Sequence, residues 1–582
     1  MYSVMHKPLA LHSFLLALVL LPLVSGGIKT KTSGDAAFKR RLTKEQSILH
    51  ALGRLTFGPG PGDVENVRKV SLKEWIDLQL HPERIPENAE LAARLAPLSS
   101  LKMNNKELAA NYPSPQMVVA VAMGRAPLPQ DPGQRATLER LALRYKNKFL
   151  KKGIGEESKL APIDKRDIKT LPEGARRNVL ATAPPDVRRK MLLEIAPQQV
   201  LAHDLAEGKL YRAIYSTHQL SEVLTDFWFN HFNIYLDKGA DRYLVTSYER
   251  DAIRPHVLGK FRDMLGATAE SPAMLWYLDN WQSVAPAAVN QRVGPKAGKR
   301  SRGLNENYAR ELLELHTLGV DGGYTQKDIV EVARCFTGWT ITEPYRGAAF
   351  SFNPRVHDNG EKVVLGVTIP AGGGKEDGLK VLDIAAHHPS TARFLSRKLA
   401  QRFVADNPPE SLVAAMAKTF TRTDGDLRAV MQTMLASREF WSEGAYRAKV
   451  KSPLEMVAGA VRAAGADVTF AFGLATKVAE LGQPLYRKQE PTGYSSANAE
   501  WVNSGALLAR MNFALALVQN KLPGVKVDAT RFQGDATAVA RGLLFTEASA
   551  QTRGAIERGQ RENKDGPTIA GLVLGSPEFQ RR

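Results

Sequence analysis

Residues 303–339 read GLNENYARELLELHTLGVDGGYTQKDIVEVARCFTGW, and their pattern is typical of helix. Leu304, Tyr308, Leu312 and Leu315 recur at the spacing of one helical face. The first half also holds more amides, carboxylates and imidazole than an ordinary amphipathic helix needs. These polar residues are Asn305, Glu306, Asn307, Arg310, Glu311, Glu314, His316 and Asp321. The stretch therefore predicts a helix with a candidate site on it.

The helical pattern extends outward from this stretch in both directions. It covers 198–281, returns at about 378 and runs with breaks to the C-terminus. One β signal interrupts it, where Phe350, Phe352 and Val356 lead through Asn359-Gly360 to residues 362–365. Asn-Gly between extended runs favours a hairpin. We predict a mainly α, multi-helical, bundle-like fold with a small β-hairpin inserted near 350–365.

Changes of composition along the chain divide it into regions. We predict a signal peptide at 1–26, an N-terminal helical region at 27–102, a basic low-regularity insertion at 103–197, a central helical core at 198–345, a β-hairpin with a Gly-rich loop at 346–372, and a C-terminal helical region at 373–582. Within the insertion, residues 136–150 are compatible with an exposed helix.

The N-terminus resembles a secretory signal. Lys7 is the one charged residue among residues 1–26, an apolar run follows from Phe14 to Val24, and small residues end at Gly26. The run is too short to span a bilayer, and no twin-Arg pair is present. We expect Sec-type export to the periplasm or the medium; an uncleaved membrane anchor is the alternative. No later stretch predicts a transmembrane segment.

The chain is strongly basic, and removal of residues 1–26 lowers its formal net charge from +19 to +18. An exported basic protein meets anionic polysaccharides and envelope surfaces. Much of the charge lies in residues 141–190, with 14 Lys or Arg against 6 Asp or Glu. Aromatic residues are scarce there, so a specific nucleic-acid groove is not indicated. Cys335, the single cysteine, is expected to be a buried, inert thiol.

The candidate catalytic residues are Asn307, Arg310, Glu311, Glu314 and His231. On a straight helix the first four fall within about 100° of one another. Glu311 and Glu314 are also candidate metal ligands, because carboxylates bind divalent cations. The structural alternative is that Arg310 pairs with Glu306 and Glu314, four residues away on either side, and that Asn305 caps the helix.

Two histidines are further candidates. His231 lies in an apolar wall with Phe227 and Trp228; it is either a satisfied core histidine or a neutral base or ligand. His357, next to Asp358, is a candidate metal ligand, although Asp is also ordinary in a turn. The cofactor is unknown and could be a divalent metal. The chain lacks nucleotide-binding, flavin-binding and covalent-haem motifs.

Several ordered segments resemble one bacterial family. They are Leu52–Gly58, Phe227–Phe232, Tyr248–His256, Met274–Asn280, Asn305–Trp339, Phe394–Pro409, Thr423–Leu427, Leu481–Tyr486 and Pro491–Tyr494. The chain resembles domain-of-unknown-function family 1800. The resemblance implies an exported bacterial protein with a co-exported protein partner, and it implies no activity.

Two functions therefore stay open. One is a cell-envelope or extracellular component that acts with a co-exported partner on an anionic polymer or the cell surface. The other is an exported metal-assisted hydrolase with its site in the central helical region. The basic charge and the absence of a known catalytic motif favour the first, and the density of ionisable groups near Glu311 favours the second.

Overall fold

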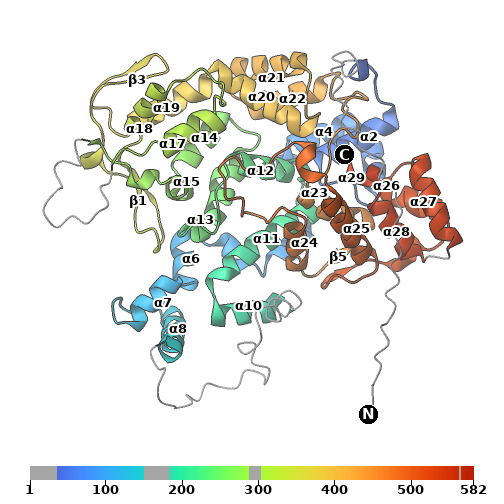
Figure 1. Ribbon diagram of the computed structural model, residues 1–582, viewed down its shortest axis with the longest axis horizontal. Coiled ribbons are helices and arrows are strands. Elements are labelled where there is room, and N and C mark those ends of the chain that lie inside the picture. The colour runs from blue at the N-terminus through green and yellow to red at the C-terminus, as the bar shows by residue number, and fades with distance from the viewer. Residues whose placement is uncertain (1–35, 150–182, 184, 287–302, 563–564) are drawn as a thin grey trace, which may run out of the picture.

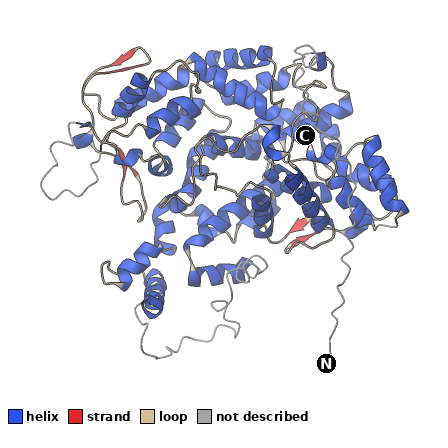
Figure 2. Cartoon of the chain, viewed as in Figure 1, coloured by secondary structure: helices blue, strands red, loops and turns tan. Residues whose placement is uncertain are grey.

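Helices dominate the structure, a computed structural model that describes residues 36–149, 183, 185–286, 303–562 and 565–582 (Figures 1 and 2). The described residues form three two-stranded antiparallel sheets. The mainly α fold with small inserted hairpins is thus confirmed. The expected signal peptide at 1–26, and residues 150–182 of the basic insertion, lie outside the described residues.

The N-terminal part of the chain forms helices α2 (Lys44–Leu55), α3 (Asp63–Val70), α4 (Leu72–Leu80), α5 (Ala89–Leu95), α6 (Asn105–Asn111), α7 (Pro115–Ala122) and α8 (Pro132–Phe149). Helix α2 begins with a capping box, in which the side chains of Thr43 and Gln46 bond each other's backbone N–H. Leu52 and Leu55 point into the core. Residues 136–149 of the helix expected at 136–150 belong to α8, and residue 150 lies outside the described residues.

The central part forms α10 (Pro185–Ile195), α11 (Gln198–Tyr215), α12 (Gln219–His231), α13 (Asp241–Ser247), α14 (Phe261–Ala269), α15 (Pro272–Tyr277), α17 (Asn307–Glu311) and α18 (Gln326–Cys335). Helix α11 is buried on almost every side, because α5, α10, α12, α13, α23 (Pro453–Ala464) and α24 (Phe472–Glu480) pack around it. Two segments, Tyr248–Ile253 and Leu312–His316, are π-helical.

The β region differs from the predicted hairpin in its pairing. Strand β1 (Trp339–Ile341) pairs with β2 (Phe350–Phe352), and β3 (Lys362–Val364) pairs with β4 (Val367–Ile369). The turn of the second hairpin is therefore Leu365-Gly366, where both residues have positive φ. Asn359-Gly360 lies in the link between the two hairpins, because Asp358 is engaged by Arg334 and cannot lead a strand back to β2.

The C-terminal part forms α19 (Glu376–His387), α20 (Pro389–Phe403), α21 (Glu410–Arg422), α22 (Leu427–Ala436), α23, α24, α25 (Ser504–Val518), α26 (Ala536–Leu544), α27 (Ala550–Arg561), α28 (Gly566–Leu574) and α29 (Pro577–Gln580), with β5 (Asp467–Val468) paired to β6 (Val525–Lys526). Helix α29 returns beside α2 (Figure 1). Buried residues from Ile48 to Phe579 accordingly form one hydrophobic cluster.

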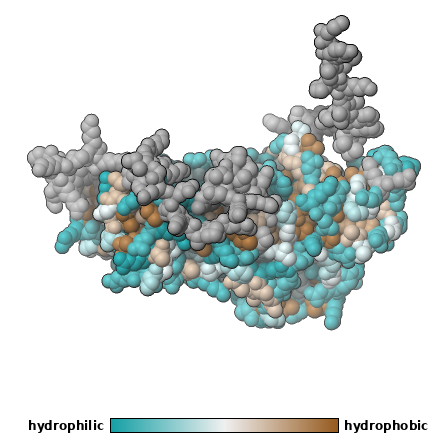
Figure 3. Space-filling model, turned by 90° about the horizontal axis from the view of Figure 1, so that it is seen from below, coloured by the Kyte–Doolittle hydropathy of each residue, from teal (hydrophilic) through white to brown (hydrophobic). Residues whose placement is uncertain are grey.

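Cys335 is fully buried, and burial raises the pKa of its thiol to about 12. The expected burial of this thiol is thus confirmed. Hydrophilic residues cover most of the coloured surface in Figure 3, and hydrophobic residues appear there in small patches. Among the described residues, no helix combines the length and apolar character needed to cross a bilayer.

Candidate functional site

His231 is the last residue of α12 and is 2% exposed. Its ring lies among Phe227, Trp228 and Phe232. Its Nε2 lies 3.0 Å from the carbonyl oxygen of His316. A carbonyl only accepts, so Nε2 carries the hydrogen and Nδ1 is left with a lone pair. Nδ1 has no hydrogen-bond partner.

His231 is neutral at ordinary pH. Burial lowers the pKa of its imidazole well below the usual range, and the charge of Lys398 lowers it further. Burial and Lys398 likewise lower the pKa of His316 to about 3. A neutral His231 with a free Nδ1 is a hydrogen-bond acceptor or a base, and it is not a cation.

The π-helical segment Leu312–His316 brings the His316 carbonyl to this position. Its wider turn leaves carbonyl groups outside the α-helical pattern. The Thr317 hydroxyl bonds the carbonyl of Leu312 at 2.5 Å, and the Gly319 amide bonds that of Leu313 at 3.1 Å. The straight-helix geometry on which the predicted site rested therefore ends at Glu311.

His231 lines a cavity of about 260 Å³. Helix α12 supplies one wall, α20 and the residues after it supply a second, and residues 492–497 supply a third. The lining consists of Phe227, Asn230, His231, Lys398, Gln401, Asp406, Lys449, Thr492, Tyr494, Ser495, Ser496 and Ala497. Three of the segments that carry the family resemblance, Phe227–Phe232, Phe394–Pro409 and Pro491–Tyr494, thus meet at one cavity.

Lys398 is the cation of this cavity that has no carboxylate partner among the described residues. Its Nζ lies 5.3 Å from the ring centroid of Phe394. Burial lowers the pKa of Lys398 to about 8, so it is mostly protonated at pH 7. The second lysine, Lys449, is neutralised by an ion pair with Asp406. The cavity therefore presents one uncompensated positive charge.

Residues 492–497 are held over the cavity by hydrogen bonds. The Asn230 amide donates to the Tyr494 carbonyl at 2.8 Å and accepts from the Tyr494 N–H at 2.7 Å. Gly493, at φ +70°, lies so close to Asn230 that a Cβ would come within 2.2 Å of the Asn230 carbonyl oxygen. Asn230 thus fixes the chain, and Lys398 remains available to a ligand.

The polar residues of α17 have mainly structural partners. Arg310 lies 3.5 Å from Glu306 and 3.6 Å from Glu314, as the structural alternative predicted. Asn307 donates its side-chain amide to the Leu278 carbonyl at 3.3 Å and its backbone N–H to the Asn305 side chain at 2.9 Å. Such contacts are typical of the first turn of a helix, so their role is structural.

Glu311 is the exception on α17, since no hydrogen bond or ion pair from the described part of the chain holds it. Burial raises the pKa of its carboxyl, and the neighbouring charge of Glu314 raises it further. No direct hydrogen bond or ion pair joins the α17 side chains to His231 or to His357. Among the described residues, the site residues predicted from the sequence are therefore not brought together by direct hydrogen bonds or ion pairs.

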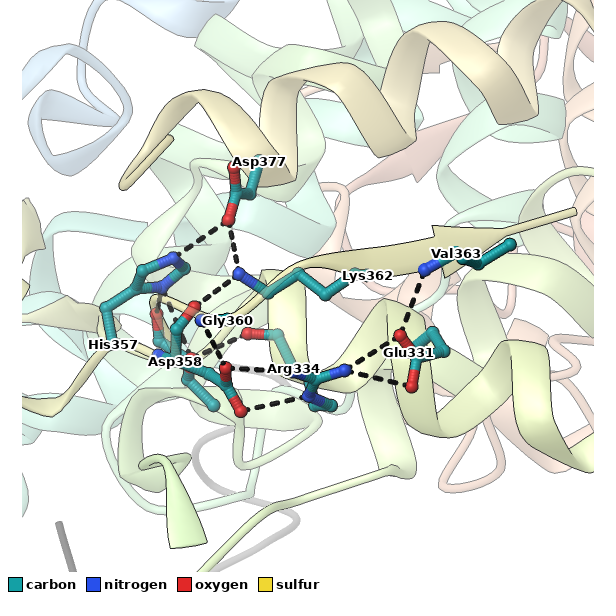
Figure 4. A network of polar contacts seen from close by, with 9 residues as sticks. Glu331, Arg334, His357, Asp358, Gly360, Lys362, Val363 and Asp377 are labelled. Carbon is teal, nitrogen blue, oxygen red and sulfur yellow. Dashed lines mark hydrogen bonds and ion pairs between the residues drawn. The ribbon is translucent and has the colours of Figure 1, made fainter. Parts of the chain in front are cut away.

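His357 belongs to a separate buried network (Figure 4). Its Nδ1 lies 2.8 Å from the Thr337 carbonyl and its Nε2 lies 3.1 Å from Asp377. Asp377 also pairs with Lys362 at 2.5 Å. Both ring nitrogens are thus engaged by the protein. Within the described ranges, no three His, Cys, Asp or Glu side chains are grouped to hold a metal ion.

Sequence reasoning found His231 but missed Lys398, Lys449 and residues 492–497. They lie far from His231 in the sequence and meet it only in the fold. One signal was available for Lys398 and residues 492–497, which belong to or adjoin segments that carry the family resemblance, whereas Lys449 lies outside those segments. An isolated lysine such as Lys398 in an amphipathic helix looks like an ordinary surface residue.

Comparison with known proteins gives the same family. The family model described as "Protein of unknown function (DUF1800)" matches residues 50–581, which is nearly the whole chain. No curated protein and no solved structure matches the chain significantly. The segments around the cavity all lie inside the matched range. The chain therefore belongs to the DUF1800 family.

Proposed function

We propose that this protein is an exported envelope or extracellular component that binds an anionic polymer, one acidic group of which enters the Lys398 cavity. The observation that carries the proposal is the uncompensated charge of Lys398. A half-buried ammonium without a carboxylate is unfavourable by itself. A ligand carboxylate, sulfate or phosphate supplies the missing charge, so its binding is favoured there.

The other walls of the cavity suit a polymer unit that carries hydroxyl groups. The amide and hydroxyl side chains of Gln401, Thr492 and Ser495 line the cavity, and such groups exchange hydrogen bonds with ligand hydroxyls. The rings of Phe227 and Tyr494 provide apolar surface. A cavity of about 260 Å³ is small among ligand pockets, which suits one unit of a chain better than a long segment. The ligand class is thus an acidic glycan.

Binding of an acidic polysaccharide tests this proposal directly. Isothermal titration of the mature chain with a polyuronate, a sulfated dextran and neutral dextran should give heat with the first two. Lys398→Met should lose this binding. Lys327→Met removes the same charge from an exposed lysine of α18 and should retain it. Equal binding by the two variants would show that general surface charge accounts for the affinity. It would refute the cavity as the binding site.

Salt dependence separates this proposal from apolar binding. Raising salt from about 50 to about 300 mM should weaken the complex, because the Debye length falls about twofold. Affinity that is indifferent to salt would contradict an anionic ligand.

The export and partner parts of the proposal have separate tests. Removal of residues 1–26 predicts a chain that begins at Gly27. Its intact mass should be found in the periplasmic or culture fraction of the native host. Native mass spectrometry of the same material should show a second exported polypeptide. A full-length cytoplasmic chain would overturn export, and a single polypeptide in every preparation would overturn the partner.

A second candidate, hydrolysis, is favoured by one observation. His231 lines the cavity, and the charge of Lys398 helps to keep its imidazole neutral; a neutral imidazole is a base that can take a proton. Release of new reducing ends from the bound polymer, abolished in His231→Phe, would support an enzyme. Unchanged polymer length under saturating protein would leave binding as the function.

A further inference from the structure

A group of six buried basic side chains lies next to the Lys398 cavity. Each is less than a tenth exposed, and we call them the basic cluster: Arg54, Arg402, Lys449, Lys451, Arg510 and Arg582. They are linked through short contacts. Arg510 donates to the Lys451 carbonyl at 2.8 Å, and Arg582 donates to the Arg402 carbonyl at 3.2 Å. The cluster is thus a single region of positive charge.

Two acidic side chains neutralise only part of this charge. Glu455 lies 2.6 Å from Arg402 and 3.1 Å from Arg582. Asp406 pairs with Lys449. Among the described residues, these two carboxylates face six basic side chains. Buried charge without a counterion is very costly.

The guanidinium groups also have unused donors. Arg54, Arg510 and Arg582 each leave Nε and Nη1 without a hydrogen-bond partner, and Arg402 leaves Nη1. Burial lowers the pKa of Arg54 to about 9 and that of Lys451 to about 7. Native structures seldom leave buried donors unpaired, so this number of them in one place calls for a ligand.

A small chamber of about 50 Å³ opens among these side chains. Its charged lining residues are Arg402, Lys449, Arg582, Glu455 and Asp226, and Asp226 is paired with Lys209. Unpaired nitrogens of two arginines therefore belong to side chains that form its wall. Ser452, the N-cap of α23, also lines it and adds the positive end of a helix dipole. A volume of this size exceeds the space that one water needs, so the chamber can hold a small anion.

We propose that this chamber holds a tetrahedral oxyanion, phosphate or sulfate, between Arg402, Lys449 and Arg582. Guanidinium groups match such an anion because their N–H groups pair with two oxygens at once. A single oxygen of Glu455 contacts both arginines, and its second oxygen accepts from the Ser452 N–H, so other guanidinium N–H groups are left for the ligand. The ion goes beyond the polymer binding at Lys398: it is a resident counterion that completes the basic cluster.

The wild-type chain provides the deciding test. The protein is purified in chloride buffer, desalted, and analysed for phosphorus and sulfur beyond its Met and Cys content. Its melting temperature is then followed while sulfate, phosphate or methyl phosphate replaces chloride at constant ionic strength. We expect either about one bound oxyanion per chain or a rise in melting temperature with each increment of oxyanion. A response equal to that of chloride, with no bound phosphorus or sulfur, would overturn the proposal.

Methyl phosphate separates the two sources of the group. Stabilisation by methyl phosphate equal to that by phosphate assigns the site to the ester end of a larger molecule. Stabilisation by phosphate alone assigns it to the free ion. Both results support the oxyanion chemistry, and failure of all three anions refutes it.

Variants test whether the oxyanion binds in the chamber. Arg582→Met should weaken the oxyanion affinity by about tenfold or more, since it removes a charged donor. Arg541→Met, at a surface pair with Glu547, and Lys398→Met should leave it unchanged. Loss of the effect in Lys398→Met would assign the anion to the larger cavity and overturn this site. Should Arg582→Met fail to fold, the response of Lys398→Met decides, because an oxyanion response retained there does not come from the Lys398 cavity.

Discussion

The Nε2 hydrogen of His231 is donated to the carbonyl oxygen of His316 at 3.0 Å, across 85 residues of chain. This contact joins the end of α12 to a π-helical turn, where a carbonyl group has lost its usual helical donor. It also fixes the tautomer of His231. One hydrogen bond thereby supports the fold and leaves Nδ1 facing no protein partner.

We expect His231→Phe to lower the free energy of unfolding by about 1–3 kcal/mol, because the His316 carbonyl is then buried without a donor. Urea denaturation measures the loss. His387→Phe, at an exposed histidine, is the control and should change stability much less. A His231→Phe chain as stable as the wild type would show that the contact contributes little.

Lys398→Met should stabilise the chain at pH 7 by about 1–3 kcal/mol while it removes polymer binding. The pKa of Lys398 is about 8 in the folded chain, below the ordinary lysine value of 10.5. The cost of burying the charge is therefore complete below pH 8 and is relieved as pH rises toward 10.5.

Thermal unfolding of wild type and Lys398→Met across pH 6–11 checks this sign. Their difference in stability should shrink above about pH 8. Polymer binding by the wild type should fall over the same range, because the neutral amine no longer attracts an anion. A constant difference across the range would show that Lys398 is not perturbed.

Glu311→Gln should leave stability unchanged or raise it by about 0.5–1 kcal/mol at pH 7, since Arg310 pairs with Glu306 and Glu314 and not with Glu311. The raised pKa of Glu311 costs stability while the carboxylate is charged, and that cost disappears as pH falls through its pKa. Denaturation at pH 4 and pH 7 compares the protonated and the charged forms of the Glu311 carboxyl. A variant less stable than the wild type would reveal a partner for Glu311.

Asp377→Asn should destabilise the chain by about 3–5 kcal/mol, because Lys362 is then buried without its counterion. The double variant Asp377→Asn with Lys362→Met removes both charges and should recover part of the loss. A double-mutant cycle by chemical denaturation measures the coupling. Additive losses would show that the two side chains act independently.

Local patterns predicted the central helices, because apolar spacing such as that of Tyr308 and Leu312, both buried, reports burial on one face. They also located the β region, but they gave the wrong turn and the wrong strand pairing. Asn359-Gly360 has the composition of a hairpin turn, but the bond from Arg334 to Asp358 holds that segment elsewhere. Turn propensity is weaker than such a tertiary contact.

The candidate site was only partly predictable for a related reason. A helical wheel assumes regular α geometry, and the π turn after Glu311 breaks that assumption. His231 was identifiable as an imidazole in an apolar wall. The uncompensated charge of its cavity is that of Lys398, which lies in another helix. Residue spacing within one helix carries no information about the helices that pack against it.

The double hydrogen bond between Asn230 and Tyr494 spans 264 residues. A nascent chain that still lacks about its last hundred residues therefore has no residues 492–497, which form the third wall of the cavity. Contacts of such long range close late and slowly. Ligand recognition should accordingly appear only at the end of maturation, and truncated or prematurely released chains should be unable to engage the polymer.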